Sequence, residues 1–286
     1  MLRETAKAKV NLTLRVLGRR PDGYNELQSL AAFAGIGDEV SLEPGKGFGL
    51  DVKGPFAGAL QEGNLIEEAA NRVASICPDC RIGNFQLEKR LPVAAGIGGG
   101  SADAAAALRL LMRANPDRLT RREVVPLAPR LGADVPVCLL QRYAMFWGLG
   151  ECVEPLEPPL EIPAVLVNPG NAIGTADVFA RLDAEPISED VSERPEAPPP
   201  FDTISSLVRY LEASGNDLEE TAIELAPVIA EVKASISGEP GCLMARMSGS
   251  GATCFGIFGD LAGARHAAGR LARNNPSWWV AASSLS

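Results

Sequence analysis

Apolar and polar residues alternate along the stretch from Ala8 to Val16, which predicts a β-strand with one buried face. The polar face carries Lys9 and Asn11 two positions apart, so their side chains should lie next to each other. The simplest interpretation of such a face is a solvated surface. Residues 18–25 are rich in turn formers, hold two arginines and Tyr24, and predict a loop before a second strand.

A second alternation, from Phe85 to Lys89, leads into four glycines within five residues, followed by Ser101 and an alanine-rich run. This order predicts a strand, a loop and a helix over residues 102–113, with Ser101 as the N-cap and Asp103 in the first turn. Glycines let backbone N–H groups approach a ligand, and a helix start adds unpaired donors and partial positive charge. The stretch is therefore a candidate phosphate-binding loop. A mobile turn before a packed helix is the alternative.

This loop differs from the two common nucleotide-binding motifs. It has no lysine before Ser101, which a Walker A loop requires. The string GIGGG at residues 96–100 also breaks the register of a dinucleotide-binding GxGxxG. The sequence therefore disfavours both of those folds.

The rest of the chain predicts further short elements. A helix is predicted between Thr120, which has capping-box spacing, and the glycine at position 132. Asp134 follows in the connecting segment after this helix, and catalytic residues are common in such connections. Alternatively, Asp134 caps the next helical turn. Residues 184–202 are rich in proline and acidic residues and predict a poorly ordered surface insertion. The other predictions are a hairpin over 144–156, a strand over 165–168, helices over 203–213, 217–236 and 261–273, strands on both sides of SGSGAT at 248–253, and a closing strand at 278–282.

Composition limits the classes of function. The 286 residues are 46% hydrophobic, enough for a large core, and the formal charge of −9 gives no general attraction to nucleic acid or to an anionic membrane. No long apolar run or signal-peptide core is present, so we expect a cytoplasmic protein with a small-molecule ligand. We expect the six cysteines to be reduced. Cys77 and Cys80 have metal-site or redox spacing, but there is no second such pair and His266 is the only histidine, which argues against both.

Three separated features fit one reaction. Phosphoryl transfer to a small alcohol needs donors around the phosphates, a cation near the transferred group and a carboxylate near the attacking hydroxyl. The glycine-rich helix start, Lys9 and Asp134 supply these groups. Spacing alone does not show that they meet in space.

Motifs spread over nearly the whole chain resemble the GHMP kinase family. They are AKAKVNLTLRVLGRRPDGYNELQSL, LPVAAGIGGGSADAAAAL, LGADVPVCL, GLGECVEPL and MSGSGAT, in the order of the family. Within the family they are most similar to the subgroup that uses ATP to phosphorylate the 2-hydroxyl of CDP-methylerythritol, in the methylerythritol phosphate route to isoprenoids. The resemblance implies an α+β protein with its site in a cleft between two domains. These would be an N-terminal domain over residues 1–156, like domain 2 of ribosomal protein S5, and a ferredoxin-like C-terminal domain over residues 157–286.

The resemblance also implies roles for individual residues. Asp134 matches the catalytic aspartate, which accepts or orients the hydroxyl proton, and Lys9 matches the lysine that pairs with it and stabilises transition-state charge. The residues implied for ATP are Asn64 near the adenine and, around the phosphates, Pro92, Val93, Ala94, Ala95, Gly96, Ile97, Gly98, Gly99, Gly100, Ser101 and Ala102. Those implied for the acceptor are Asn11, Tyr24, Asn25, Phe179, Gly249, Ser250 and Gly251. Mg²⁺ is implied with Ser101 as a candidate ligand, and the protein is expected to be a monomer or weak homodimer.

One position departs from the family pattern. Asn25 stands where the family usually has a histidine that hydrogen-bonds the cytosine. An amide offers both a donor and an acceptor, so we expect cytidine recognition to be retained. Two alternatives stay open. Another GHMP kinase, acting on homoserine or mevalonate, would have no evident use for Tyr24 and the GRRPDGY loop. A non-catalytic binder with the same fold would not need Lys9 and Asp134.

Overall fold

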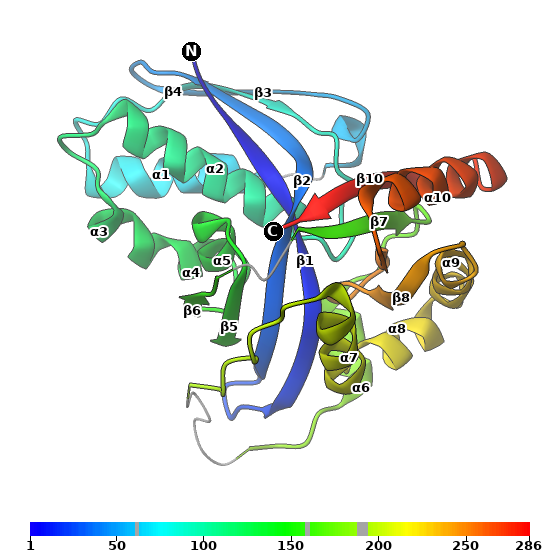
Figure 1. Cartoon of the computed structure of the whole chain (residues 1–286). Coiled ribbons are helices and arrows are strands. Elements are labelled where there is room, and N and C mark those ends of the chain that lie inside the picture. Colours follow the sequence, from blue (N-terminus) through cyan, green and yellow to red (C-terminus); the bar gives the residue numbers. More distant parts are fainter. Residues whose placement is uncertain (61–62, 158–160, 188–193) are drawn as a thin grey trace. The chain divides into compact units, whose positions relative to one another are not determined.

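The computed structural model describes residues 1–60, 63–157, 161–187 and 194–286. The chain forms two compact units, each assembled from separate stretches of sequence (Figure 1). Unit 1 comprises Met1–Lys9, Ile36–Val93 and Gly98–Gln141, and unit 2 comprises Val10–Gly35, Ala94–Ile97 and Arg142–Ser286. The domain boundary expected near residue 156 stays a prediction.

Unit 1 combines a small sheet with helices. β3 runs parallel to β4, and β4 pairs antiparallel with residues 39–43 of β2. The strands are β1 (Leu2–Arg19) up to Lys9, β2 (Asn25–Glu43) from Ile36, β3 (Phe48–Lys53) and β4 (Gly83–Glu88). The helices are α1 (Leu65–Ile76), α2 (Gly99–Ala114), α3 (Arg121–Val124), α4 (Ala128–Leu131) and α5 (Val135–Leu140), with 3₁₀ turns at Ala57–Ala59 and Val125–Leu127.

Helix α2 is the buried helix of unit 1. Its alanine-rich first half, from Ala102 to Ala107, is fully buried, because methyl side chains let neighbouring helices approach closely. Helices α1 and α5 both pack against it. This packing fixes the start of α2 relative to α5, the helix that follows Asp134.

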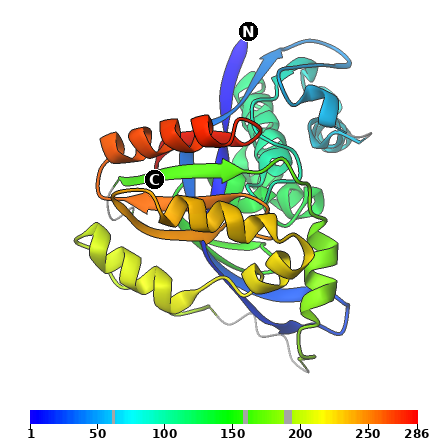
Figure 2. The same ribbon diagram turned by 90° about the vertical axis from the view of Figure 1, so that its right-hand side faces the viewer.

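Unit 2 contains an antiparallel sheet in the order β10-β7-β9-β8. The chain passes through it as β-α-β-β-α-β, the ferredoxin-like arrangement that was predicted for the C-terminal domain. Figure 2 shows α9 and α10 against this sheet, α9 on β8 and β9 and α10 on β7 and β10. The strands are β7 (Ile162–Asn168), β8 (Cys242–Met247), β9 (Cys254–Phe258) and β10 (Trp279–Leu285), and the helices are α6 (Thr175–Leu182), α7 (Ile204–Ser214), α8 (Glu219–Leu225), α9 (Val228–Ser237) and α10 (Leu261–Asn274).

The predicted hairpin forms in unit 2 from β5 (Ala144–Gly148) and β6 (Cys152–Pro155), and β5 pairs with residues 27–31 of β2. The core of the unit joins the β1 residue Leu14 to apolar side chains of β7, β9 and the helices. The mixture of helices and antiparallel strands confirms the predicted α+β class. Within the described residues, no helix combines the length and apolar character needed to cross a membrane.

Several local predictions are wrong, and proline explains two of them. The helix expected over 217–236 is broken between α8 and α9, because Pro227 has no N–H to donate and disfavours helical geometry at the residue before it. The helix bracketed by Thr120 and Gly132 is likewise divided into α3, a 3₁₀ turn and α4, with prolines at 126 and 129.

Other corrections concern capping and cysteines. Helix α2 begins at Gly99 with Gly98 as its N-cap, so Ser101 lies inside the first turn and Asp103 lies beyond it, buried. Cys77 and Cys80 form a disulfide instead of reduced thiols, while Cys138, Cys152, Cys242 and Cys254 are not disulfide-bonded. The surface insertion expected at 184–202 lies partly outside the described residues, at 188–193.

Candidate active site

Lys9 and Asp134 form an ion pair in unit 1 although 125 positions separate them in the sequence. Lys9 Nζ donates to Asp134 Oδ1 over 2.6 Å. The lysine side chain is only 3% exposed, so the alternative of a solvated face is wrong for Lys9, whereas the Asp134 side chain is 33% exposed. Asp134 directly precedes α5 but makes no capping hydrogen bond with its side chain, so the capping alternative is also wrong. The pair thus combines a buried cation with a carboxylate that is open on one side.

Gly98 brings the start of α2 against this pair. Its φ of +62° favours glycine, and a Cβ at this position would lie 3.4 Å from Lys9 Cβ and Cε and 3.6 Å from Asp134 Oδ2. The first amides of α2, from Gly99 onward, follow directly and have no acceptor within the helix. Unpaired amide donors and the positive end of a helix dipole therefore lie beside a lysine and a carboxylate, which suits an anionic ligand.

The preceding part of the glycine loop contacts the SGSGAT segment within unit 2. Ser248 Oγ accepts a hydrogen bond from Asn11 N and donates one to Gly96 O, both over 3.0 Å. The backbone N–H of Thr253 donates to Ala95 O over 3.1 Å. A Cβ on Gly96 would lie 2.5 Å from Ser248 O and 2.7 Å from the Gly251 backbone, so this close approach requires glycine. Two motifs that lie 152 positions apart are therefore held together by backbone groups and the Ser248 hydroxyl.

A buried ionic cluster supports the loop from within unit 1. Lys89, at the end of β4, donates to Asp38 Oδ2 over 2.5 Å and to Asp103 Oδ2 over 2.7 Å. Asp38 Oδ1 also accepts from the backbone N–H groups of Arg90 and Leu91, and Lys89 Nζ would lie 3.2 Å from a Cβ on Gly99. The cluster therefore ties β2, the residues that lead into the loop, and helix α2 to one another. Sequence reasoning missed it.

One lysine faces two carboxylates in this cluster. Burial and the neighbouring charges shift the pKa values of Asp103 and Lys89. Burial raises the pKa of Asp103 to about 8, and the nearby charge of Lys89 only partly opposes that shift. Burial alone would lower the pKa of Lys89, but attraction to Asp103 and Asp38 outweighs it, so the pKa of Lys89 is raised. The lysine therefore stays charged, and Asp103 carries a proton over much of the neutral range.

Asn64, the residue expected near the adenine, lines a cavity of about 500 Å³ in unit 1. Its side-chain Oδ1 caps α1 by accepting from Ile66 N over 2.8 Å. The other lining residues are mostly apolar or glycine and include Phe48, Leu50, Val52, Ala57, Leu60 and Gly63. A flat aromatic ring fits such walls.

Two of the expected acceptor-binding residues have buried oxygens with no partner among the described residues, Asn11 Oδ1 and Asn25 Oδ1. Asn11 Nδ2 donates to Ser29 Oγ over 2.8 Å, so its amide is held in place. A buried acceptor without a donor is costly, which makes both oxygens candidates for ligand contacts.

The remaining residues expected to bind the acceptor substrate lie at several places in unit 2. Tyr24 is 65% exposed at the end of the β1–β2 hairpin, and Phe179 is half-buried on α6. Gly249 approaches Gly96 O, and Ser250 Oγ lies 2.9 Å from Thr175 Oγ1 at the start of α6. The SGSGAT segment is thereby connected to the helix that carries Phe179.

Of the loop residues expected to bind ATP, Pro92, Ala95, Ile97 and Ala102 have buried side chains. Val93, Ala94 and Gly100 keep some exposure, with Ala94 at a positive φ of 51°. The loop therefore offers backbone groups to a ligand in preference to side chains.

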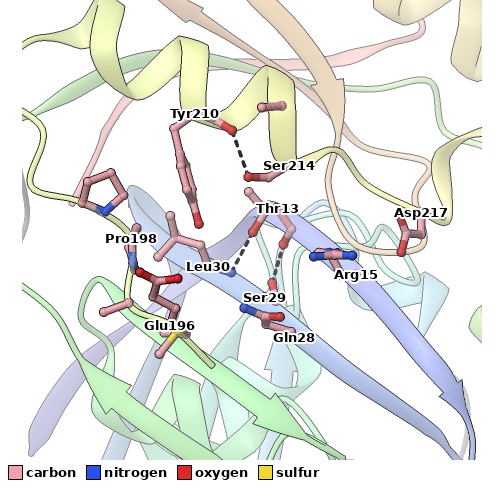
Figure 3. A pocket seen from close by; sticks show the side chains of 14 residues that line it. Thr13, Arg15, Gln28, Ser29, Leu30, Glu196, Pro198, Tyr210, Ser214 and Asp217 are labelled. Carbon is pink, nitrogen blue, oxygen red and sulfur yellow. Dashed lines mark hydrogen bonds between the residues drawn. The ribbon is translucent and has the colours of Figure 1, made fainter. Parts of the chain in front are cut away.

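A separate cavity of about 820 Å³ opens in unit 2 beside β1, β2 and α7 (Figure 3). Its walls mix apolar and polar side chains, and the polar ones include Thr13, Arg15, Gln28 and Ser29 from the two strands and Tyr210 from α7. Ser29 Oγ, which binds Asn11, donates to Thr13 O over 2.5 Å at this wall. Of the described residues that line it, none is Tyr24, Asn25 or Phe179, so the cavity is distinct from the residues expected to bind cytosine.

Comparison with known proteins agrees with this geometry. The model of the GHMP kinases N terminal domain matches residues 64–142, and that of the GHMP kinases C terminal domain matches residues 201–277. A relative from Rhodopseudomonas palustris, named 4-diphosphocytidyl-2-C-methyl-D-erythritol kinase, is 48% identical over 100% of this chain and 97% of its own length.

Solved structures give the same result. A crystal structure of 4-(cytidine 5'-diphospho)-2C-methyl-D-erythritol kinase superimposes with a TM-score of 0.76 at 34% identity, covering 100% of this chain and 99% of that one. A homoserine kinase from Cytophaga hutchinsonii shares the fold, with a TM-score of 0.67 at 18% identity and coverage of 97% and 92%. On the matched domains and the full-length relatives, this chain belongs to the GHMP kinase family.

Proposed function

We propose that this protein transfers the γ-phosphoryl group of ATP to the 2-hydroxyl of 4-diphosphocytidyl-2-C-methyl-D-erythritol, a step in the methylerythritol phosphate route to isoprenoid precursors. Relatives of that name align along the whole chain. The observation that carries the proposal is the Lys9–Asp134 ion pair of 2.6 Å beside Gly98 at the start of α2. Phosphoryl transfer to an alcohol needs this combination of a carboxylate, a cation and phosphate-binding amides.

In this mechanism Asp134 orients the acceptor hydroxyl. Its carboxylate is held on one side by Lys9 and is open on the other, so it can accept a hydrogen bond from the hydroxyl and take its proton as the new P–O bond forms. The buried Lys9 ammonium places positive charge next to the transferred group, and the amides at the start of α2 donate to the phosphate oxygens. The carboxylate needs little basicity, because the transition state of phosphoryl transfer is loose.

The cytidine end of the acceptor would be recognised by the hairpin of β1 and β2. Asn25 Oδ1 is buried without a partner among the described residues, and the exocyclic amine of cytosine is a donor of the right kind. Tyr24 and Phe179 supply aromatic faces for the base. Asn11 Oδ1, the other orphaned acceptor, would bind a hydroxyl of the methylerythritol unit.

ATP would place its adenine in the cavity at Asn64 and its phosphates at the glycine loop. Bound Mg²⁺ would neutralise phosphate charge during transfer. The Ser101 hydroxyl faces the turn that carries Asp134, lying 3.8 Å from the position of a Cβ on Gly132. A hydroxyl is a hard oxygen donor, so Ser101 fits an ion that binds through one or two protein ligands and the substrate phosphates. The proposal also includes action in the cytoplasm as a monomer or weak homodimer.

A coupled assay of ADP release tests the proposal. The wild-type protein, supplied with ATP and Mg²⁺, should release ADP with 4-diphosphocytidyl-2-C-methyl-D-erythritol and not with homoserine or mevalonate. Asp134→Asn keeps the shape of the side chain but removes its charge, and it should lower kcat by about 10²-fold or more. Release of ADP with homoserine or mevalonate alone would assign another acceptor. Undiminished activity of Asp134→Asn would remove Asp134 from the mechanism.

A further inference from the structure

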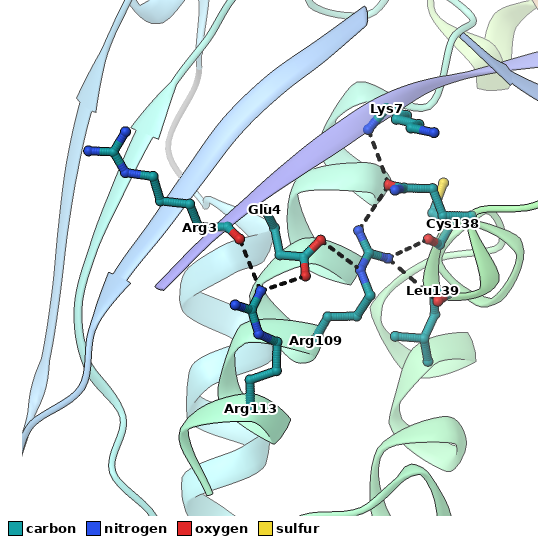
Figure 4. Close-up of polar contacts among 8 residues, drawn as sticks. Arg3, Glu4, Lys7, Arg109, Arg113, Cys138 and Leu139 are labelled. Carbon is teal, nitrogen blue, oxygen red and sulfur yellow. Dashed lines mark hydrogen bonds and ion pairs between the residues drawn. The ribbon is translucent and has the colours of Figure 1, made fainter. Parts of the chain in front are cut away.

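Arg109, on the second half of α2, contacts two other segments of unit 1 (Figure 4). Its Nη1 donates to the backbone carbonyl of Cys138 over 2.8 Å and lies 3.5 Å from that of Leu139. Its Nη2 donates to Gln141 Oε1 over 2.9 Å, and its Nε lies 3.5 Å from Glu4 Oε2 on β1. The side chain is only 16% exposed. A mostly buried guanidinium thus makes hydrogen bonds through Nη1 and Nη2, whereas Nε has only the ion-pair contact with Glu4 among the described residues.

These contacts connect Arg109 to the two segments that carry Lys9 and Asp134. Cys138 and Leu139 lie near the end of α5, the six-residue helix that begins directly after Asp134. Gln141 Oε1 accepts from Arg109 and also from the backbone N–H of Lys7, which lies two positions before Lys9 on β1. Arg109 therefore connects the helix behind Asp134 with the strand that carries Lys9.

The Arg109 side chain lies far along α2 from the start of the helix, where the phosphates would bind. It follows Gly98 by 11 positions, which corresponds to about 16 Å along α2 at 1.5 Å per residue. The guanidinium therefore does not touch a group bound at the start of the helix. It can still affect the reaction, because a displacement of 1 Å at a catalytic group can cost on the order of 10²-fold in rate.

We propose that Arg109 is a positioning residue that sets the separation of Lys9 and Asp134 by holding α5 and β1 on α2. The proposal rests on the function proposed above. The planar fork of arginine suits it to this position, because a lysine ammonium presents its donors from a single point. The positive charge of the guanidinium also suits the carbonyl end of α5, which carries partial negative charge.

Arg113 provides a matched control one turn further along α2. It donates to Glu4 Oε1 over 2.9 Å and to the backbone carbonyl of Arg3 over 3.0 Å, and it has no bond to α5 in the described residues (Figure 4). If Arg109 served only to anchor the beginning of β1 through Glu4, Arg113→Met would have the same effect as Arg109→Met. Methionine keeps the length of the arginine stem and removes the donors in both variants.

The first experiment measures steady-state kinetics. Arg109→Met should lower kcat about 10-fold to 100-fold while the KM values for ATP and the acceptor stay within about twofold, because geometry and not binding is disturbed. Gln141→Leu should lower kcat in the same way, Gln141→Glu should retain activity because it keeps the acceptor oxygen, and Arg113→Met should match the wild type. The double variant Arg109→Met/Gln141→Leu should lose less than the sum of the two single losses. An unchanged kcat in Arg109→Met, an equal loss in Arg113→Met, or additive losses would overturn the proposal.

Amide hydrogen exchange tests the same inference without the reaction. In the protein without substrates, Arg109→Met should speed exchange in α5 and at Lys7, while Arg113→Met should leave both unchanged. If the wild type does not phosphorylate the cytidine acceptor but this exchange pattern appears, the proposed function fails and the positioning of the two segments by Arg109 stands. If activity is present and exchange in α5 is unaffected, Arg109 does not position α5.

Discussion

Replacing Lys89 with methionine tests the buried ionic cluster beneath the glycine loop. Methionine fills the volume of the lysine stem but leaves Asp38 and Asp103, whose side chains are 0% and 4% exposed, without the ammonium between them. Removing one partner of a buried ion pair costs about 3–5 kcal/mol, because the remaining charge is left without compensation in a medium of low polarity. We therefore expect the free energy of unfolding to fall by about 3–5 kcal/mol in Lys89→Met.

Urea unfolding at pH 7, followed by far-ultraviolet circular dichroism, measures this loss. Arg181→Met is the control, since its ion pair with Glu224 joins two side chains that are 61% and 59% exposed. Such surface pairs contribute about 0–1 kcal/mol. A loss below about 1 kcal/mol in Lys89→Met would refute the view that the lysine neutralises buried carboxylates.

Three further predictions concern the neighbouring residues. Because the pKa of Asp103 is raised from 3.8 to about 8, the folded protein binds more protons than the unfolded chain between these values, and its stability should fall as pH rises through that window. Asp103→Asn should flatten this dependence in urea titrations. Gly96→Ala should destabilise by more than about 1 kcal/mol and raise the KM for ATP, because its Cβ would meet the backbone of Ser248. Asn25→Ala should raise the KM for the cytidine acceptor and leave that for ATP unchanged, because it removes the unpaired acceptor.

Each of these predictions has a result that contradicts it. An equally steep pH dependence in Asp103→Asn would place the titrating group elsewhere. For Gly96→Ala the control is Gly170→Ala, where φ is also positive, at +86°, but nothing lies within 4 Å of the new Cβ. Equal losses in the two alanine variants would mean that the contact at Gly96 is unimportant. An unchanged acceptor KM in Asn25→Ala would exclude that side chain from cytidine recognition.

Local patterns in the sequence predict the strands and the helix after the glycine loop, although that helix begins at Gly99 and not at residue 102. The alternation at Phe85 marks β4, and the amphipathic spacing over 261–273 marks α10. The breaks in the helices could also be predicted from the sequence, because the prolines at 126, 129 and 227 lie at the interruptions. The disulfide of Cys77 and Cys80 has the short spacing that was noted, but spacing alone does not give the oxidation state.

Burial of the polar face of β1 could not be predicted from local pattern. Lys9 is covered because Asp134 lies against it, and Asn11 is covered by contacts with Ser29 and Ser248, which are 18 and 237 positions away. A period of two shows that a strand has two faces and does not show what covers each. The resemblance to a known family, not the periodicity, is what predicted that Lys9 and Asp134 would meet.

The central claim is that Lys9 and Asp134 together direct phosphoryl transfer to the 2-hydroxyl of the acceptor. Phosphorus-31 NMR of the reaction product tests it most directly. With 4-diphosphocytidyl-2-C-methyl-D-erythritol, ATP and Mg²⁺, the wild type should give a new phosphomonoester resonance with the phosphate on the 2-hydroxyl, and Asp134→Asn and Lys9→Met should form it at least about 10²-fold more slowly. A phosphate on another position of the acceptor, or the same rate in either variant, would contradict the account.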